Sequence, residues 1–376
     1  MPLAIDQSRL ATAAQRVLGA AAPLPAKMMA ASGIVPGAPA GDVVAVIAVL
    51  TEHEDAKVSA KARETIRKLP APILNGALGA DLEPAVLTLL ADAYVDSAEV
   101  VERLLRMPRI DVAALEILAS RADERIGEIV ATNEERLLAN PTVIEKLYMN
   151  KRVRMSTADR ILELAVRNGL VLSIPAFKEA AQAIKNELIA EASEEPTYED
   201  KLSKEATEIA TKLALDASVE DTHVMDDEGE EQVQEKLLPL HARLAGMSIS
   251  QKIRKATLGT SAERLLLVRD TNRLVAAAAV QSPMLNENEA ARISASRQVS
   301  DDVLRLIAMN REWTRSYQIK LNLVMNPRTP FSFTSRLVPH LHDHDVRNLS
   351  KSKNVPGSVQ QLARQQMARK QSGKKG

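Results

Sequence analysis

The sequence predicts an all-α protein, an α-solenoid whose helices form two arrays joined by an acidic linker. Three observations predict this fold: a pattern that recurs in the C-terminal part of the chain, an interior made of small aliphatic side chains, and a sorting of charge by segment. A chain of 376 residues also exceeds the usual size of one globular core, which favours two domains or one elongated array.

The recurring pattern is an apolar helix that ends at a polar residue followed by proline. Pro283 follows one such helix and Pro327 follows the next, 44 positions later. A second apolar segment follows each proline, and a third segment begins at an acidic residue, Asp301 in one copy and Asp345 in the other. Helical units of this length are typical of α-solenoids.

The segments Asn326–Pro330 and Asp345–Arg347 resemble the HEAT and armadillo class, and the Asn-Pro punctuation resembles the related leucine-rich repeat variants. The resemblance covers a minority of the chain. It implies stacked helices that present a surface to another macromolecule, although some such families bind DNA and a few carry an enzymatic site. The iron–sulfur cluster of some leucine-rich variants needs cysteine ligands, and this chain has no cysteine.

Composition supports a helical interior and excludes several chemistries. Only 2% of the residues are aromatic while 45% are hydrophobic, so Ala, Leu, Val and Ile must build the core. The absence of cysteine excludes disulfides, thiolate nucleophiles and Cys-ligated metals, and it fits a reducing compartment. No apolar run reaches membrane-spanning length and no secretory core begins the chain. We expect a soluble, cytoplasmic protein without membrane insertion.

The formal net charge of zero conceals a strong sorting of charge. Residues 187–236 contain 17 acidic and 4 basic side chains, whereas residues 237–376 contain 23 basic and 9 acidic ones. The acidic stretch has few large apolar residues, so it cannot bury enough surface to offset the entropy cost of ordering. This composition predicts a flexible linker, within which residues 201–215 could form an isolated amphipathic helix.

Five parts are expected along the chain. They are an irregular N-terminal arm, a first helical array, an acidic flexible linker, a second helical array and a basic tail, over residues 1–40, 41–190, 191–236, 237–363 and 364–376. The arm is rich in Ala, Pro and Gly, and its prolines interrupt helices. Within the first array, residues 43–50 form an apolar helix, and Asp55 starts a second helix that Pro70 ends. Apolar periodicity then continues to the helix expected over residues 176–190, which closes this array.

The two arrays share a sequence match. Residues 117–121 match residues 293–297 at an offset of 176, and Asn133 matches Asn310 at an offset of 177. Asn140, which precedes a proline, punctuates the first array as Asn326 punctuates the second. Because asparagine at a repeat boundary usually bonds to the backbone of a nearby turn, we expect structural roles for Asn140, Asn310 and Asn326.

His340, His342 and His344 form the densest set of possible metal ligands. His-x-His spacing beside carboxylates could hold zinc if the segment were a loop or strand. The favoured interpretation is a turn between two helices, with Asp343 or Asp345 as the helix cap. We therefore predict neither a metal nor a cofactor.

Arg269, Asp270, Asn272 and Arg273 form a polar cluster between two apolar helices. Such a cluster could be a recognition site or an acid–base pair. The favoured alternative is an inter-helix turn with an aspartate cap and solvated arginines.

Trp313 and Tyr317, with Phe331 and Phe333, bring most of the scarce aromatic residues into about one repeat. Aromatic side chains are favoured as interface anchors, although more often they pack in the core or between repeats. Arg347, in the segment that carries the family resemblance, completes the candidate interaction residues.

No catalytic constellation stands out: we find no Ser/His/Asp set at a usable spacing, no Gly-rich phosphate loop and no paired carboxylates in an apolar setting. The sequence favours a non-enzymatic scaffold or adaptor that binds protein partners through the surfaces of its helices. The alternative is nucleic-acid binding by the basic second array, with the acidic linker competing for the same cations. The shortage of aromatic residues for base stacking weighs against it.

Overall fold

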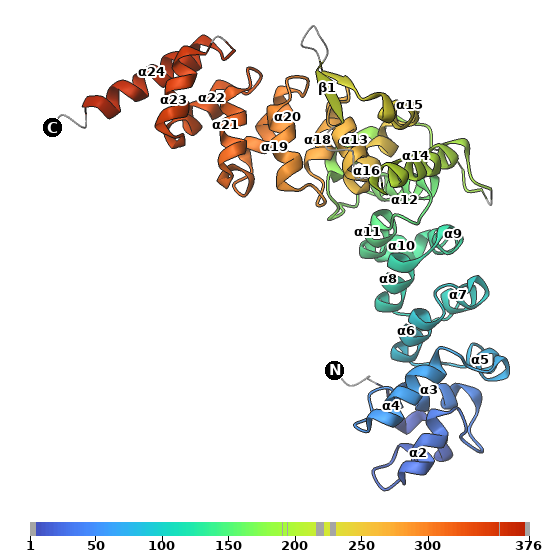
Figure 1. The fold of residues 1–376 in the computed structure, drawn as a ribbon. Coiled ribbons are helices and arrows are strands. Elements are labelled where there is room, and N and C mark those ends of the chain that lie inside the picture. Colours follow the sequence, from blue (N-terminus) through green and yellow to red (C-terminus); the bar gives the residue numbers. More distant parts are fainter. Residues whose placement is uncertain are drawn as a thin grey trace. The chain divides into compact units, whose positions relative to one another are not determined.

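The computed structural model describes residues 5–189, 191–193, 195–215, 222–225, 231–352 and 354–372. The predicted all-α class is confirmed, since these ranges form twenty-four α-helices, four short 3₁₀ turns and one two-stranded sheet (Figure 1). The chain divides into two compact units, unit 1 (Met1–Leu172) and unit 2 (Ser173–Gly376). None of the helices within these ranges combines the length and the apolar character needed to cross a membrane.

Unit 1 consists of short helices, each packed on helices one to three places away in chain order, as α3 packs on α4 and α5 and α8 packs on α6 and α11. Its elements are η1 (Gln7–Arg9), α1 (Thr12–Leu18), α2 (Leu24–Ala31), α3 (Ala40–Leu50), α4 (Ala56–Ile66), α5 (Ala71–Ala77), α6 (Pro84–Ala93), α7 (Ala98–Leu105), α8 (Val112–Arg121), α9 (Glu124–Ala131), α10 (Glu134–Ala139), α11 (Pro141–Met149) and α12 (Met155–Arg167).

The expected irregular arm is in part wrong, because residues 24–31 form helix α2. Pro25 lies in the first turn of this helix, where a missing N–H costs no intrahelical hydrogen bond. Ala30 and Ala31 are fully buried, and α2 packs on α3 and α4. Prolines that were interpreted as helix breakers therefore include one that starts a helix.

Unit 2 combines short helices with a small antiparallel hairpin, in which His223 pairs with Val233 and Met225 pairs with Glu231. Its elements are α13 (Phe177–Ile184), α14 (Tyr198–Leu215), β1 (His223–Met225), β2 (Glu231–Val233), η2 (Glu235–Leu237), α15 (Leu238–Ala245), α16 (Ile249–Leu258), α17 (Ser261–Leu267), α18 (Arg273–Val280), α19 (Glu287–Ala295), α20 (Asp301–Met309), η3 (Trp313–Arg315), α21 (Tyr317–Met325), α22 (Phe331–Leu337), η4 (Val338–His340), α23 (Asp343–Lys351) and α24 (Gly357–Ser372). The expected basic tail is thus helical as far as Ser372.

The boundary between the units differs from the predicted one. Helix α13 was expected to close the first array, but it packs on α16 and α18 in unit 2 (Figure 1). Gln281 at the end of α18 donates a hydrogen bond of 2.7 Å to Glu179 in α13. Amphipathic periodicity predicted the helix but could not say which array it joins.

The prediction of a flexible linker is wrong for residues 198–215, which form helix α14. Leu202, Ala206 and Ala210 recur every four residues and are buried, so the helix has one narrow apolar face. Lys255 Nζ in α16 also donates to the hydroxyl of Thr207 in α14 at 2.6 Å. The amphipathic helix that the sequence allows at residues 201–215 is thus present, but it packs on α15 and is not isolated. The remaining acidic residues at 216–221 and 226–230 lie outside the described residues.

Each short helix leaves its last carbonyl groups without intrahelical partners, and at three helix ends a side chain that follows a later helix binds them. Asn150, which follows α11, donates from Nδ2 to the carbonyl oxygens of Ala119 and Ala122 at the end of α8, at 3.0 and 2.8 Å. Its Oδ1 accepts from the backbone N–H of Arg152. We call a residue in this position a carbonyl clamp.

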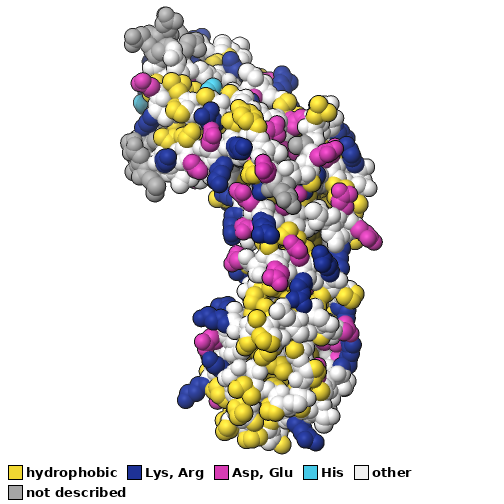
Figure 2. All heavy atoms as spheres, turned by 90° about the vertical axis from the view of Figure 1, so that its right-hand side faces the viewer, with side chains coloured by type: hydrophobic (Ala, Val, Ile, Leu, Met, Phe, Trp, Pro, Cys, Tyr) yellow, Lys and Arg dark blue, Asp and Glu magenta, His cyan; other side chains and the backbone are white. Residues whose placement is uncertain are grey.

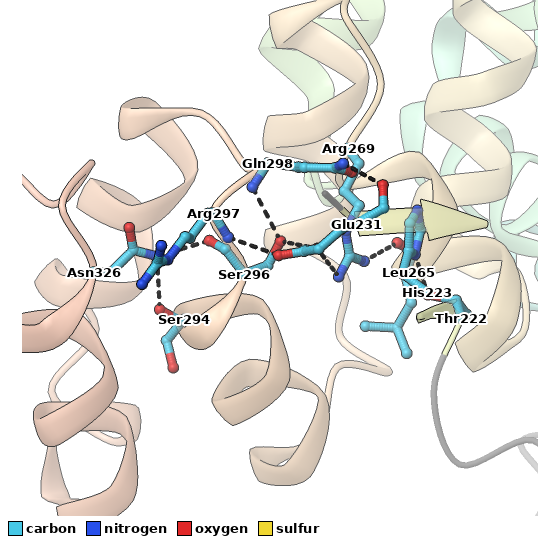
Figure 3. Close-up of polar contacts among 10 residues, drawn as sticks. All are labelled: Thr222, His223, Glu231, Leu265, Arg269, Ser294, Ser296, Arg297, Gln298 and Asn326. Atoms are coloured by element: carbon cyan, nitrogen blue, oxygen red, sulfur yellow. Dashed lines mark hydrogen bonds and ion pairs between the residues drawn. The ribbon is translucent and has the colours of Figure 1, made fainter. Parts of the chain in front are cut away.

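Unit 2 contains two further carbonyl clamps. Asn326, after α21, donates to the carbonyl oxygens of Ser294 and Ser296 at the end of α19, at 3.0 and 2.7 Å (Figure 3). Ser282, after α18, donates from Oγ to the carbonyl oxygen of Thr257 in α16 at 2.6 Å. Ser282 and Asn326, which the sequence pattern places at the same point of two units 44 positions apart, thus make the same kind of contact: each binds a carbonyl group near the end of an earlier helix.

The expected correspondence of Asn140 with Asn326 is wrong. Asn140 Nδ2 donates to the carbonyl oxygen of Arg136 in its own helix, and Asn150 occupies the clamp position of unit 1. Asn310 instead accepts from the backbone N–H of Glu312 and caps the next turn. All three predicted asparagines bond to backbone groups.

We predict that Asn326→Ala lowers the free energy of unfolding by about 1–3 kcal/mol, because two buried carbonyl groups lose their donor. Urea unfolding followed by circular dichroism measures the effect. The matched control is Asn168→Ala, since Asn168 is exposed and bonds only to Leu164 in its own helix. Equal losses in both variants would show that the clamp contributes nothing beyond an ordinary helix end.

Candidate interaction site

The first polar centre of unit 2 surrounds Glu231 of strand β2. Its carboxylate accepts hydrogen bonds from the hydroxyl of Ser296 at 2.7 Å, the backbone N–H of Arg297 at 2.9 Å and the Arg269 guanidinium at 3.2 Å (Figure 3). The side chain of Gln298 donates to the Glu231 carbonyl oxygen. These contacts fix the hairpin to the turn after α17 and to the end of α19.

The electrostatics of this centre favour an ionised Glu231. The side chains of Arg269 and Glu231 are only 7% and 13% exposed. Burial alone would raise the pKa of Glu231, but the hydrogen bonds from Ser296 and Arg297 and the Arg269 guanidinium together hold that pKa below its usual value. The carbonyl oxygen of Ser296 also accepts a hydrogen bond from the clamp residue Asn326, so the contacts of Glu231 are connected to the packing of α21 on α19 (Figure 3).

The predicted polar cluster at residues 269–273 is divided among structural partners. Asp270 pairs with Lys252 at 3.2 Å, and Asn272 caps α18 by accepting from the backbone N–H of Leu274. Arg273 is exposed and lies 3.5 Å from Asp302. The N-cap of α18 is therefore Asn272, whereas the sequence predicted an aspartate in this role.

A second centre is an open groove between α20, η3, α21 and α22, with a volume of about 840 Å³. We call it the basic groove, and its lining combines four cations with apolar side chains: Ala308, Met309, Arg311, Thr314, Arg315, Lys320, Phe333, Arg336, Leu337 and His340. The volume is within the range of about 300–1,000 Å³ that is usual for binding sites.

No carboxylate lines the basic groove within the described residues, and the ion pairs of this part of the chain use other side chains. Arg311, Arg315 and Arg336 are exposed and Lys320 is half-buried. The Arg336 guanidinium lies 5.1 Å from the centre of the Phe333 ring. The groove therefore concentrates positive charge above an apolar floor, a combination that suits a ligand with carboxylates or phosphates.

Neither of the two aromatic candidates, Trp313 and Tyr317, is among the residues that line this groove. Trp313 is half-buried in η3. The hydroxyl of Tyr317 donates to Asp345 and accepts from the backbone N–H of His342 at 3.1 Å. Tyr317 thereby connects α21 to the start of α23, so the structure gives it a packing role. Arg347 is exposed on α23.

The three clustered histidines occupy different environments. His340 belongs to η4 and lines the basic groove, His342 precedes α23, and His344 is exposed, 3.4 Å from Asp345. No group of three carboxylate or imidazole side chains that could hold a metal occurs in the described ranges. Neither aspartate provides the side-chain cap that was expected for this helix.

A third surface is apolar and belongs to unit 1. Figure 2 shows hydrophobic side chains gathered at the lower end of the view, over the N-terminal helices. Leu24, Met29 and Ile34 in and after α2 are at least half exposed. Exposed apolar patches are common at protein interaction sites.

Comparison of the chain with protein-family models, with curated proteins and with solved structures gave no significant match.

We predict that Glu231→Gln destabilises the protein at neutral pH and that the difference disappears in acid. Because the folded pKa lies below the ordinary value of 4.5, the stability that ionised Glu231 contributes is present above 4.5 and is lost as the pH falls through the folded pKa. Thermal unfolding from pH 7 to pH 3 measures this, with the exposed Glu235→Gln as control. A deficit that is independent of pH would refute the ionic role.

Proposed function

We propose that this protein is a non-enzymatic scaffold or adaptor, built as a HEAT-like α-solenoid in two arrays, that binds protein partners through the surfaces of its helices. The observation that carries the proposal is the basic groove, where cations that form no ion pair within the described residues lie beside partly exposed apolar side chains. A partner that covered these apolar side chains would gain their burial, and its acidic groups would pair with the cations. We expect the protein to act in the cytoplasm.

The repeat interpretation is supported by the carbonyl clamps. Asn150, Ser282 and Asn326 each follow a helix and bond to carbonyl groups of an earlier helix. Recurrence of one contact at corresponding positions is what stacked helical units produce.

The buried ionisable groups of unit 2 support a structural role over a catalytic one. Arg264 binds Glu289 through two nitrogen atoms at 2.8 and 3.1 Å, and Lys255 lies 3.1 Å from Glu263. Glu263 and Glu289 also complete capping boxes at the starts of α17 and α19. These buried ion pairs join neighbouring helices.

Nucleic-acid binding by unit 2 is the second candidate, and the four groove cations, which form no ion pair within the described part of the chain, favour it. Phosphate contacts release counterions, so the observed affinity would fall steeply with salt, by about 0.9 logarithmic units per tenfold of salt for each phosphate neutralised. An affinity for duplex DNA that hardly changes with salt would exclude this mode of binding.

The scaffold proposal predicts that affinity purification of the tagged full chain from its native source recovers a protein in stoichiometric amount, and that nuclease treatment leaves the recovery unchanged. Chemical cross-linking with mass spectrometry then locates the contact on this chain. Recovery of nucleic acid alone, or of proteins that nuclease releases, would contradict the scaffold function and support the alternative.

A further inference from the structure

Two segments of the chain use the same local design and can be compared position by position. Asp123 and Ser300 cap α9 and α20 from their side chains, which sets an offset of 177. The clamp residues Asn150 and Asn326 follow α11 and α21, which sets an offset of 176. Helices α9, α11 and α12 of unit 1 therefore correspond to α20, α21 and α22 of unit 2.

The positions of unit 1 that correspond to the lining of the basic groove are buried in contacts between helices. Ala131, Ile144, Thr157 and Ile161 are between 0% and 3% exposed. At the corresponding positions unit 2 has Ala308, Lys320, Phe333 and Leu337, which are half-buried and line the groove. The groove is thus an opened version of a closed helix contact.

Charge explains why the contact closes in unit 1. Glu128 of α9 accepts a hydrogen bond from Thr157 at 2.6 Å and pairs with Arg160 at 2.5 Å, both on α12. Helix α12 accordingly packs on α9 and α10. Glu128 therefore joins α9 to α12.

In unit 2 the joining residues are replaced. Arg305 occupies the position of Glu128 and Phe333 that of Thr157, while Arg336 corresponds to Arg160. Two arginines cannot form the ion pair, and Arg311 likewise replaces Glu134. Helix α22 packs mainly on α21, η4 and α24, and the six-residue α10 is reduced to the short turn η3. Because of these substitutions, no ion pair joins α20 to α22, and the space between the two helices is lined by positive charge.

We propose that the basic groove binds an acidic, amphipathic α-helix of a partner protein, whose carboxylate side chain occupies the position that Glu128 has in unit 1. This inference rests on the proposed scaffold function. The charge is complementary, because the groove has four cations and no carboxylate among its described lining residues. The apolar face of the partner helix covers Phe333, Leu337 and Met309, the last of which is 63% exposed.

A helix fits these observations better than a nucleic-acid duplex. A duplex offers phosphates to the cations but has no apolar side chains to cover Met309 and Phe333. An amphipathic helix satisfies both parts of the groove with side chains three and four positions apart.

The experiment is a selection of helical peptides from a random display library against the full-length protein. Enriched peptides are expected to carry Glu or Asp beside large apolar residues at helical spacing. Their affinity for the Arg336→Glu and Arg311→Glu variants should fall roughly tenfold or more, since each change replaces attraction by repulsion. The control is Lys351→Glu, an equal charge change at an exposed site outside the groove, which should bind normally. Circular dichroism verifies that each variant is folded.

A charge exchange makes the test specific: a peptide with Lys in place of its key Glu should bind the Arg336→Glu variant better than the unmodified protein. The inference is overturned if no peptide is enriched, if the enriched peptides lack acidic residues, or if they bind the groove variants and the unmodified protein equally. Duplex DNA that loses affinity in the same variants, while no peptide binds, would replace the helix by nucleic acid. A native protein partner that binds the groove variants normally would reject the groove and leave the scaffold function standing.

Discussion

The unsatisfied carbonyl groups at the end of each short helix are the constraint on which this structure depends. A helix of eight to eleven residues has a large fraction of its peptide groups at its ends, so burying it requires partners for those groups. Asn150, Ser282 and Asn326 provide them from a later helix. Each clamp also fixes the spacing between two helices.

The sequence predicted this framework in part. The recurrence of Pro283 and Pro327 at 44 positions correctly paired Ser282 with Asn326. Asn140 does not correspond to Asn326, although both precede a proline: Pro141 starts a helix, whereas Pro327 follows a clamp residue. The offset of 176 that matched the two arrays pointed to Asn150, so the signal was present in the sequence.

Other features depended on contacts that no local pattern records. The acidic composition predicted a linker, yet one narrow apolar face was enough to pack α14, and Glu231 bonds to residues 38 or more positions away. Trp313 and Tyr317 lie in the part of the chain that forms the basic groove, but Tyr317 binds Asp345 instead of lining the groove. The charge of the groove comes from four cations: Arg311, Arg315, Lys320 and Arg336. The replacement of Glu128 by Arg305 at the matched position was the available sign of that groove.

The central claim is that the same helix contact supports the fold in unit 1 and is reserved for a partner in unit 2. The most direct measurement compares the free energies of unfolding of Arg160→Ala and Arg336→Ala in the full chain without a partner. The account predicts a loss of about 2 kcal/mol for Arg160→Ala, which breaks the pair with Glu128. For Arg336→Ala, which loses only the contact with Phe333, it predicts a change of less than about 1 kcal/mol. Equal losses in the two variants would contradict the account.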